Sequence, residues 1–244
     1  MKILLAPSET KLEGGKENFD LESLLFSELT PTRKILLHKY INILQKNDHS
    51  ELSKIFGLKK ERDINYHNKE IIHELTMKAI ERYTGVAFDY LNYKELQEKE
   101  KTYIDSNVIL CSNLFGFLRA DDMIPEYKLK QGVALGDLKP EKLYKEQSHL
   151  LEAYLQEDDI LDLRAGFYDK FYKPSKNYTT LKFIKNGKVV SHWAKAYRGI
   201  VLREVAKANI KSIEEFMELS IVNLSINEIQ TKKNKTEIIY TIKS

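Results

Sequence analysis

The sequence predicts an α/β protein in which helices pack on one mixed β-sheet. Short apolar runs, each bounded by turn residues, alternate along the chain with longer segments of helical periodicity. Apolar residues make up 42% of the 244 positions, enough to build a sizeable core. No linker, internal repeat or low-complexity stretch divides the chain, so residues 1–244 are predicted to form a single domain.

The strands are predicted from short apolar runs and from turn signals. A run of three to five apolar residues that ends at a turn residue is typical of a buried strand rather than a helix. Asn186-Gly187 is the strongest hairpin signal in the chain, and the tail is predicted to close a second hairpin around residues 232–235. The predicted strands are 3–5, 108–111, 159–163, 180–184 and 189–193, with the second hairpin over 221–242.

The helices are predicted from capping residues and from apolar spacing. Thr30 can cap a helix in which Pro31 takes the first position, where no backbone N–H is needed. Gly57 ends a short second helix. The predicted helices are 30–44, 50–56, 70–83, 94–105, 140–155, 195–208 and 212–219, and residues 114–132 are predicted to be irregular.

Composition and charge restrict the function only weakly. The formal net charge is +3, which by itself does not indicate a nucleic-acid partner. Cys111 is the one cysteine, so no internal disulfide can form, as is typical of a reducing compartment. The apolar N-terminal run is too short for a signal peptide, and no run is long enough to cross a bilayer. We therefore expect a cytoplasmic protein with no membrane partner.

Polar, glycine-marked loops follow the first three predicted strands. If these strands are parallel, their carboxyl ends meet at one edge of the sheet, where ligands of open α/β sheets bind. A helix start with two basic residues would add to this edge, because backbone N–H groups there favour anions. Phosphate is the anion that such a mixture of arginine and lysine suits best, although isolated surface charges are usually only solvated. The side chains expected to converge on one cleft are Ser8, Glu9, Lys11, Arg119, Arg164, Lys195 and Arg198.

Several short motifs in collinear order, from residue 1 to about residue 208, resemble the YaaA family. Each is short, but their common order is far more specific than any one of them. They read PSETK at 7–11, ELTPTR at 28–33, ERYTGV at 81–86, LFG at 114–116, IPEYKL at 124–129, DLRAG at 162–166 and SH at 191–192.

The resemblance implies a peroxide-stress protein that limits damage from unincorporated iron. It also implies a YaaA-type fold, one positively charged cleft that binds double-stranded DNA, and a helix-hairpin-helix element, here near residues 198–219. That stretch lacks the glycines that usually form such a hairpin. The residues expected to contact DNA or phosphate are Lys11, Arg119, Lys128, Arg164, Lys195 and Arg198.

An enzyme acting on a nucleotide or on damaged nucleic acid in the same cleft is the alternative hypothesis. Its catalytic candidates are Ser8, Glu9 and Asp122, and a small phosphorylated ligand would be its partner. Direct iron binding by Glu9, Asp121 and Asp122 is a third hypothesis, although adjacent aspartates are usually solvated. No cofactor or metal site of recognisable spacing is present, and Cys111 is expected to be a packed core residue. The sequence does not indicate an oligomeric state.

Overall fold

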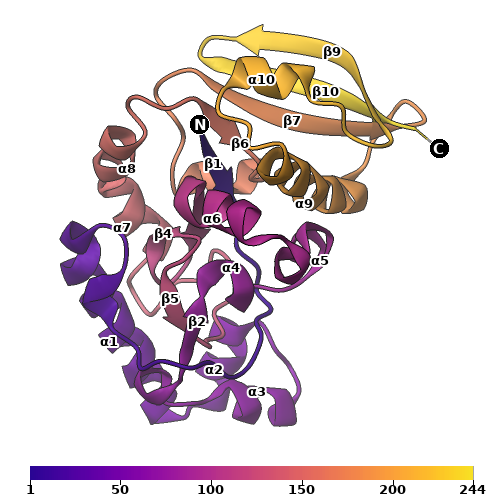
Figure 1. Cartoon of the computed structure of the whole chain (residues 1–244). Coiled ribbons are helices and arrows are strands. Elements are labelled where there is room, and N and C mark those ends of the chain that lie inside the picture. Colours follow the sequence, from indigo (N-terminus) through magenta and orange to yellow (C-terminus); the bar gives the residue numbers. More distant parts are fainter. Residues whose placement is uncertain (244) are drawn as a thin grey trace.

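One large mixed sheet runs through the molecule. The computed structural model describes residues 1–243, and the side chains of all of these except residues 191 and 192 (Figure 1). The strand order is β4-β3-β1-β6-β7-β10-β9, with β8 paired to the far end of β7. The strands are β1 (Lys2–Leu5), β3 (Val108–Ser112), β4 (Gly116–Arg119), β6 (Ile160–Asp162), β7 (Tyr178–Lys185), β8 (Lys188–Val189), β9 (Leu224–Lys232) and β10 (Lys235–Ile242).

The middle of the sheet is parallel and its margins are antiparallel. Strand β1 pairs in parallel with β3 on one side and with β6 on the other, and the parallel run continues through β7 to β10. The strands β4, β8 and β9 each run antiparallel to their neighbour. A second, two-stranded sheet pairs β2 (Thr76–Lys78) with β5 (Met123–Pro125). The predicted mixed sheet with packed helices is therefore confirmed.

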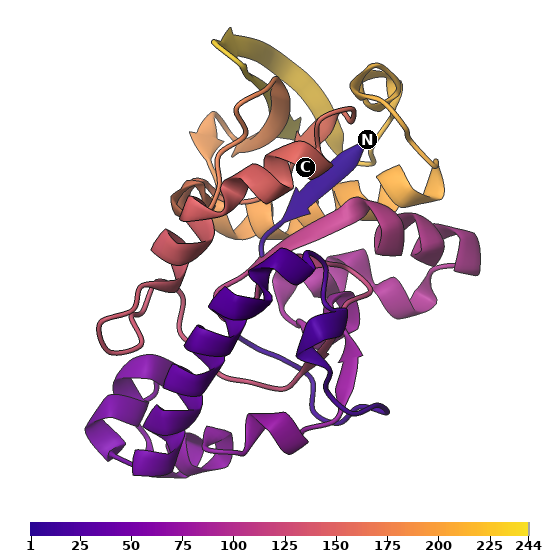
Figure 2. The ribbon, with the colours of Figure 1, turned by 90° about the vertical axis from the view of Figure 1, so that its left-hand side faces the viewer.

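The helices cover both faces of the central strands. Helix α6 and helix α9 lie on one side of β1 and β3, and α8 lies on the other (Figures 1 and 2). The helices are α1 (Thr30–Lys46), α2 (His49–Phe56), α3 (Glu61–His67), α4 (Ala79–Arg82), α5 (Val86–Leu91), α6 (Glu98–Asn107), α7 (Pro140–Glu146), α8 (Ser148–Tyr154), α9 (Ser191–Lys207) and α10 (Ile213–Glu218). Among residues 1–243, no helix has the length and apolar character needed to cross a membrane.

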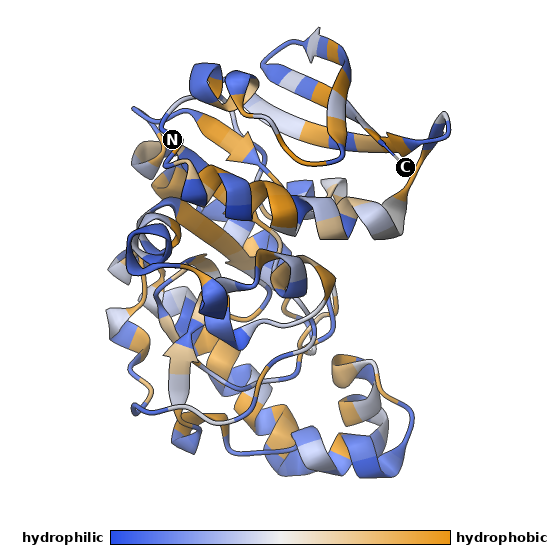
Figure 3. Ribbon diagram, turned by 45° about the vertical axis from the view of Figure 1, so that its right-hand side comes forward, coloured by the Kyte–Doolittle hydropathy of each residue, from blue (hydrophilic) through white to orange (hydrophobic). Residues whose placement is uncertain are grey.

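The core lies where the parallel strands meet these helices. Ile3, Leu4, Ile109 and Leu110 have no exposed surface, and the central strands are apolar along their length (Figure 3). Strands buried on both faces read as continuous apolar runs, which is why the sequence revealed them. Burial of this surface is the main contribution to the stability of the fold.

Two elements differ from the sequence prediction. The segment 70–83, predicted as one helix, is instead a 3-10 turn, strand β2 and the short helix α4. Only the second half of its apolar stripe faces the core: Ala79 and Ile80 are buried, whereas Ile72 and Leu75 are exposed. Between the two halves, Thr76 pairs with Pro125 of β5. The segment predicted to be irregular, 114–132, contains β4 and β5, because Gly116 at a φ of 74° turns the chain back along β3.

The other elements follow the prediction with shifted ends. The predicted helix 140–155 is divided into α7 and α8 at Gln147, and α9 begins at Ser191 rather than near residue 195. The second strand of the Asn186-Gly187 hairpin is correspondingly short. Helices α3 and α5 were not predicted. Helices α9 and α10 cover the region predicted as a helix-hairpin-helix, with Asn209 at a positive φ between them, but this arrangement does not identify that motif.

A buried arginine holds the loop that follows β1. Arg82 has no exposed surface, and its guanidinium donates to the carbonyl oxygens of Leu12 at 2.5 Å and Gly14 at 2.8 Å. It also donates to the carbonyls of Leu75 at 2.7 Å and Ile124 at 3.2 Å. One side chain therefore joins the loop after β1 to both strands of the small sheet, and it fixes the loop that forms one wall of the site.

Candidate functional site

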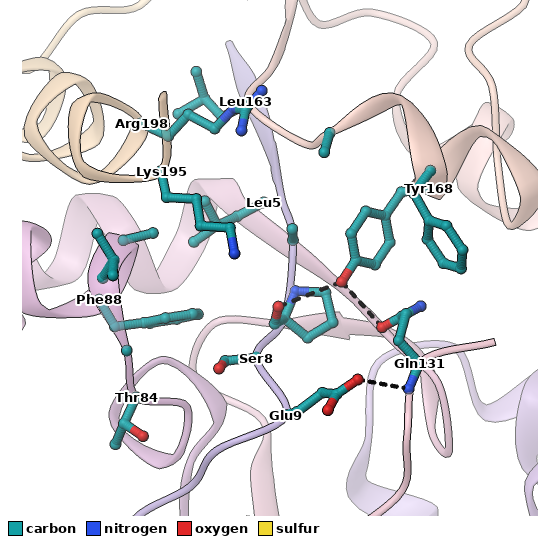
Figure 4. Close-up of a pocket in the computed structure, with 17 residues that line it drawn as sticks. Leu5, Ser8, Glu9, Thr84, Phe88, Gln131, Leu163, Tyr168, Lys195 and Arg198 are labelled. Atoms are coloured by element: carbon teal, nitrogen blue, oxygen red, sulfur yellow. Dashed lines mark hydrogen bonds between the residues drawn. The ribbon is translucent and has the colours of Figure 1, made fainter. Parts of the chain in front are cut away.

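A cavity of about 530 Å³ opens at the carboxyl edge of the sheet, beside β1 and β6. The chain leaves β1 for β3 on one side of it and later enters β6 on the other side, so the strand order reverses at β1. Open α/β sheets bind ligands at such a reversal. The cavity is lined by the loop after β1, the loop after β6, the start of α5, Gln131 and one face of α9 (Figure 4).

The wall of the cavity is mostly apolar. Leu5 and Leu163 come from the strand ends, Phe88 from α5, and Phe167 and Tyr168 from the loop after β6. Phe88 and Tyr168 lie on opposite sides of the space in Figure 4. Flat apolar walls with a few polar groups are typical of sites for small organic ligands, including those that carry an aromatic ring.

Two cationic side chains of α9 reach this cavity, one helical turn apart. Lys195 and Arg198 both line it, and the amino group of Lys195 points into the space in Figure 4. Neither side chain forms a hydrogen bond or ion pair with any described side chain or backbone group, and Nε of Arg198 is buried without a partner. Burial lowers the pKa of Arg198, yet a guanidinium stays charged at physiological pH. These are the cations in the cleft that are free to bind an anion.

Glu9, Gln131 and Tyr168 form the opposite wall. The backbone N–H of Gln131 donates to Oε1 of Glu9 at 3.0 Å, and the Tyr168 hydroxyl donates to Oε1 of Gln131 at 3.0 Å. The side-chain Nε2 of Gln131 is buried and has no partner among the described atoms. This amide nitrogen is therefore an unsatisfied donor within the wall.

Ser8 lies at the cavity beside the start of α5. Its hydroxyl is 3.1 Å from that of Thr10, which in turn donates to the carbonyl of Thr84 at 3.3 Å. Gly85 follows at a φ of 101°, and a Cβ there would lie 3.4 Å from Oγ of Ser8. This backbone conformation suits glycine alone, and it lets the two loops approach closely.

Lys11 and Lys128 support the loop after β1 rather than lining the cavity. Nζ of Lys11 donates to the carbonyl of Ser8 at 3.3 Å and lies 3.9 Å from the centre of the Tyr127 ring. Nζ of Lys128 donates to the carbonyl of Glu9 at 3.2 Å. The geometry therefore gives these two predicted phosphate ligands a bracing role beneath Ser8 and Glu9.

We expect Lys11 to make the stability depend on pH. Burial lowers the pKa of Lys11 to about 7, and the neighbouring Lys128 acts in the same direction. In the unfolded chain a lysine titrates near about 10.4, so between pH 7 and 9 the unfolded chain binds more protons than the folded protein. The contribution of Lys11 to stability therefore rises with pH across this window. Urea denaturation at pH 7, 8 and 9 should show this rise, and Lys11→Met should remove it.

The matched control is Lys46→Met, which changes an exposed lysine at the end of α1. This variant should keep the pH dependence of the parent protein. Equal pH slopes for the parent protein and Lys11→Met would contradict the assignment.

Arg164 is buried in an ion pair behind the cavity. Its Nη2 donates to Oδ2 of Asp162 at 2.8 Å and its Nε to Oδ1 at 2.9 Å, and Nη1 lies 3.5 Å from Sγ of Cys111. The Asp162 carboxylate therefore neutralises most of the positive charge with which Arg164 would bind a phosphate. Cys111 is fully buried, as expected for a core residue.

Arg119 and Asp122 do not join the cleft, so the predicted convergence is wrong for Arg119. Strand β4 runs antiparallel to β3 and places Arg119 opposite Ile109, near the start of β3 and away from the carboxyl edge. Arg119 pairs with Asp121 at this position. Asp122 is buried and accepts from the N–H groups of Leu25 and Arg119. Burial raises the pKa of Asp122 to about 6.

Glu9, Asp121 and Asp122, the three residues of the iron-binding hypothesis, do not lie together in the structure. Glu9 lines the cavity, whereas the two aspartates lie near the start of β3. In the part of the chain that the structure describes, no three His, Cys, Asp or Glu side chains are grouped so as to hold a metal ion. The side chains of Ser191 and His192 lie outside the described residues.

Sequence reasoning missed Gln131, Phe88 and Tyr168. The cleft lies after β1 and β6, as the strand-end argument requires, and it includes Ser8, Glu9, Lys195 and Arg198 as predicted. Phe88 comes from a short helix that the periodicity did not reveal. Gln131 lies at the end of a long loop with no spacing signal, although the neighbouring Gly132, at a φ of 72°, marks a turn there.

The fold and this cleft define an open α/β protein with a cavity at the switch point of a mixed sheet. The family model described as "Peroxide stress protein YaaA" matches residues 1–230. The chain belongs to this family.

Relatives resemble the chain over most of its length. An uncharacterized protein of Campylobacter jejuni is 46% identical over 244 residues, covering 99% of both chains. A UPF0246 protein of Corynebacterium glutamicum is 32% identical and covers 90% of this chain and 91% of its own. A UPF0246 protein of Malacoplasma penetrans is 28% identical, covering 96% and 97%. The predicted family is thereby confirmed, together with its description as a peroxide-stress family.

Proposed function

We propose that this peroxide-stress protein binds one nucleotide, free or within a damaged nucleic acid, in the cleft at the carboxyl edge and acts on it there. One observation carries the proposal: an open, mostly apolar cavity with two cations on one wall, Lys195 and Arg198, that have no ion-pair partner among the described residues. A nucleotide has the matching chemistry, because its base is flat and apolar on both faces and its phosphate is an anion. Of the two hypotheses drawn from the sequence, this geometry favours the enzyme over the binding of an intact duplex.

Recognition can be divided between the two walls. The base would lie between Phe88 and Tyr168, which line the cavity on opposite sides. The phosphate would lie against α9, where lysine and arginine supply charge-assisted hydrogen bonds. Ser8 and Glu9 flank the same space and are the residues placed to take part in chemistry on the bound nucleotide.

Calorimetry with the four nucleoside monophosphates AMP, GMP, CMP and UMP tests the proposal. We expect at least one to bind, and Arg198→Ala should weaken it at least about tenfold, since a hydrogen bond to a charged group contributes roughly 1.5–3 kcal/mol. Arg62→Ala is the matched control, because Arg62 is exposed on α3 and contacts nothing in the cleft. No binding by any of the four up to about 1 mM would overturn the proposal.

Duplex DNA is the second candidate, favoured by a further cationic cavity that adjoins the first along the sheet edge. Contacts to the phosphate backbone would bind without reading sequence, and each would add about 0.9 to the salt slope. A gel-shift titration at several salt concentrations separates the candidates. Affinity for duplex that falls steeply with salt, without any affinity for monophosphates, would favour the DNA reading.

We further propose that the protein limits iron-dependent oxidative damage in the cytoplasm through this cleft. The family description and the cationic, nucleotide-sized site support this role. In cells challenged with hydrogen peroxide, deletion of the protein should then reduce survival, and Arg198→Ala should reduce it equally. Full protection by that variant would separate the stress role from the cleft.

A further inference from the structure

A second cavity of about 440 Å³ adjoins the first, beyond Lys195 and Arg198 of α9 and next to β7. Ala165, Lys195 and Arg198 line both cavities, so the two spaces meet along one face of this helix. The pair on α9 can therefore contact a group that lies between the cavities.

The second cavity arises from a gap in the pairing of β7. Strand β6 pairs with β7 only as far as Asp162 opposite Thr180, and β8 begins its pairing at Ile184. Between these points that side of β7 has no strand partner in the described chain. Leu181, Lys182 and Phe183 therefore all line the cavity, although alternate residues of a strand normally face opposite sides.

More cationic than anionic side chains line this cavity. It holds five cationic side chains and three carboxylates, listed as Arg164, Lys182, Lys195, Arg198 and Lys235 against Asp162, Asp169 and Glu237. Asp162 is taken up by Arg164. Glu237 faces two lysines, Lys235 at 2.8 Å and Lys182 at 4.0 Å. Asp169 also attracts Lys235, but from beyond ion-pair distance.

We propose that the ligand spans both cavities and is a phosphodiester-linked dinucleotide unit with a terminal phosphate. This rests on the proposed function, in which the first nucleotide lies in the first cavity. The linking phosphate lies against Lys195 and Arg198, which both cavities share. The second nucleotide enters the second cavity, and its outer phosphate binds Lys182 and Lys235, whose charge Glu237 only partly offsets.

The positions of the lysine and arginine side chains fit two linked nucleotides better than a single nucleotide. On a helix, side chains three residues apart are neighbours about 5–6 Å apart, so Lys195 and Arg198 form one anion subsite. Lys182 and Lys235 come from different strands, β7 and β10, and form a separate one. Two anion subsites separated by a cavity match two successive phosphates of a chain.

Calorimetry with thymidine 5′-monophosphate, d(TpT), d(pTpT) and d(TpTp), and with the same series for the other bases, tests the inference. We expect one of the terminally phosphorylated dinucleotides to bind at least about tenfold more tightly than d(TpT). Lys182→Gln and Lys235→Gln should each reduce this gain and leave the affinity for the monophosphate unchanged. Each variant leaves Glu237 with one lysine partner, which protects the fold.

Lys188→Gln is the matched control. Lys188 is exposed on β8 and does not line the cavity, so the substitution removes the same charge outside the site. It should change none of the affinities. Monophosphate binding with no gain from a terminal phosphate would overturn the second subsite and leave the proposed function standing. Equal losses for monophosphate and dinucleotide in the two lysine variants would also overturn it. Failure of every probe to bind would overturn the proposed function itself.

Discussion

Replacing Gly199 by alanine is expected to lower the free energy of unfolding by about 3 kcal/mol, the upper range for overpacking a core. A Cβ at this position would lie 2.0 Å from the carbonyl oxygen of Ala87 and 2.9 Å from the backbone N of Leu91. Helices α5 and α9 therefore touch through their backbones, and an added methyl group must push them apart. Thermal or urea denaturation measures the loss.

The same substitution at Gly166 is the control. A Cβ there meets nothing within 4 Å, and the residue does not need a positive φ. Gly166→Ala should change the free energy of unfolding by less than about 0.5 kcal/mol. Equal stability for the two variants would show that α5 and α9 can separate at little cost, and that the cleft wall they form is adjustable.

Arg82→Met is expected to cost about 3–5 kcal/mol. The change leaves the carbonyl groups of Leu12, Gly14, Leu75 and Ile124 without their donor, and an unsatisfied buried acceptor costs roughly 1–3 kcal/mol. Some of these carbonyls can regain water at the loop, so the costs do not add fully. The measurement is urea denaturation at pH 7.

Arg62→Met serves as the control for this change. Arg62 is exposed on α3, and its replacement should alter stability by less than about 0.5 kcal/mol. Arg82→Met should also weaken binding at the cleft in any variant population that remains folded, because the loop carrying Ser8 and Glu9 loses its anchor. A stable Arg82→Met protein with unchanged binding would show that the loop holds its shape without the arginine.

The central strands could be predicted from the sequence because each depends on a local signal, and the place of the cleft follows once these strands are taken to be parallel. Continuous apolar runs mark β1, β3 and β6, and a strand-end rule then places the loops at one edge. Ser8 follows from that rule alone, whereas Lys195 was placed by a helix start that the structure puts four residues earlier, at Ser191. The position of Arg119 could not be derived in this way, because it depends on whether β4 runs parallel or antiparallel to β3.

Burial and pairing were the properties that local patterns could not provide. Lys11, Lys128 and Arg164 read as cations near strand ends, yet the fold turns each of them inward to a carbonyl or a carboxylate. The spacing that suggested a helix over 70–83 was overruled by pairing between β2 and β5, two strands far apart in sequence. Tertiary contacts decide such cases.

The central position of β1 has a consequence for folding during synthesis. This strand precedes all the other described strands in the chain, yet its two partners, β3 and β6, begin at Val108 and Ile160. Its apolar side chains therefore have no strand to pair with until well over a hundred residues have left the ribosome. Pairings between such distant segments form slowly, and an unpaired apolar strand is prone to aggregate. The nascent chain therefore carries β1 with one edge unpaired until β6 is made, when more than half of the 244 residues have been synthesised.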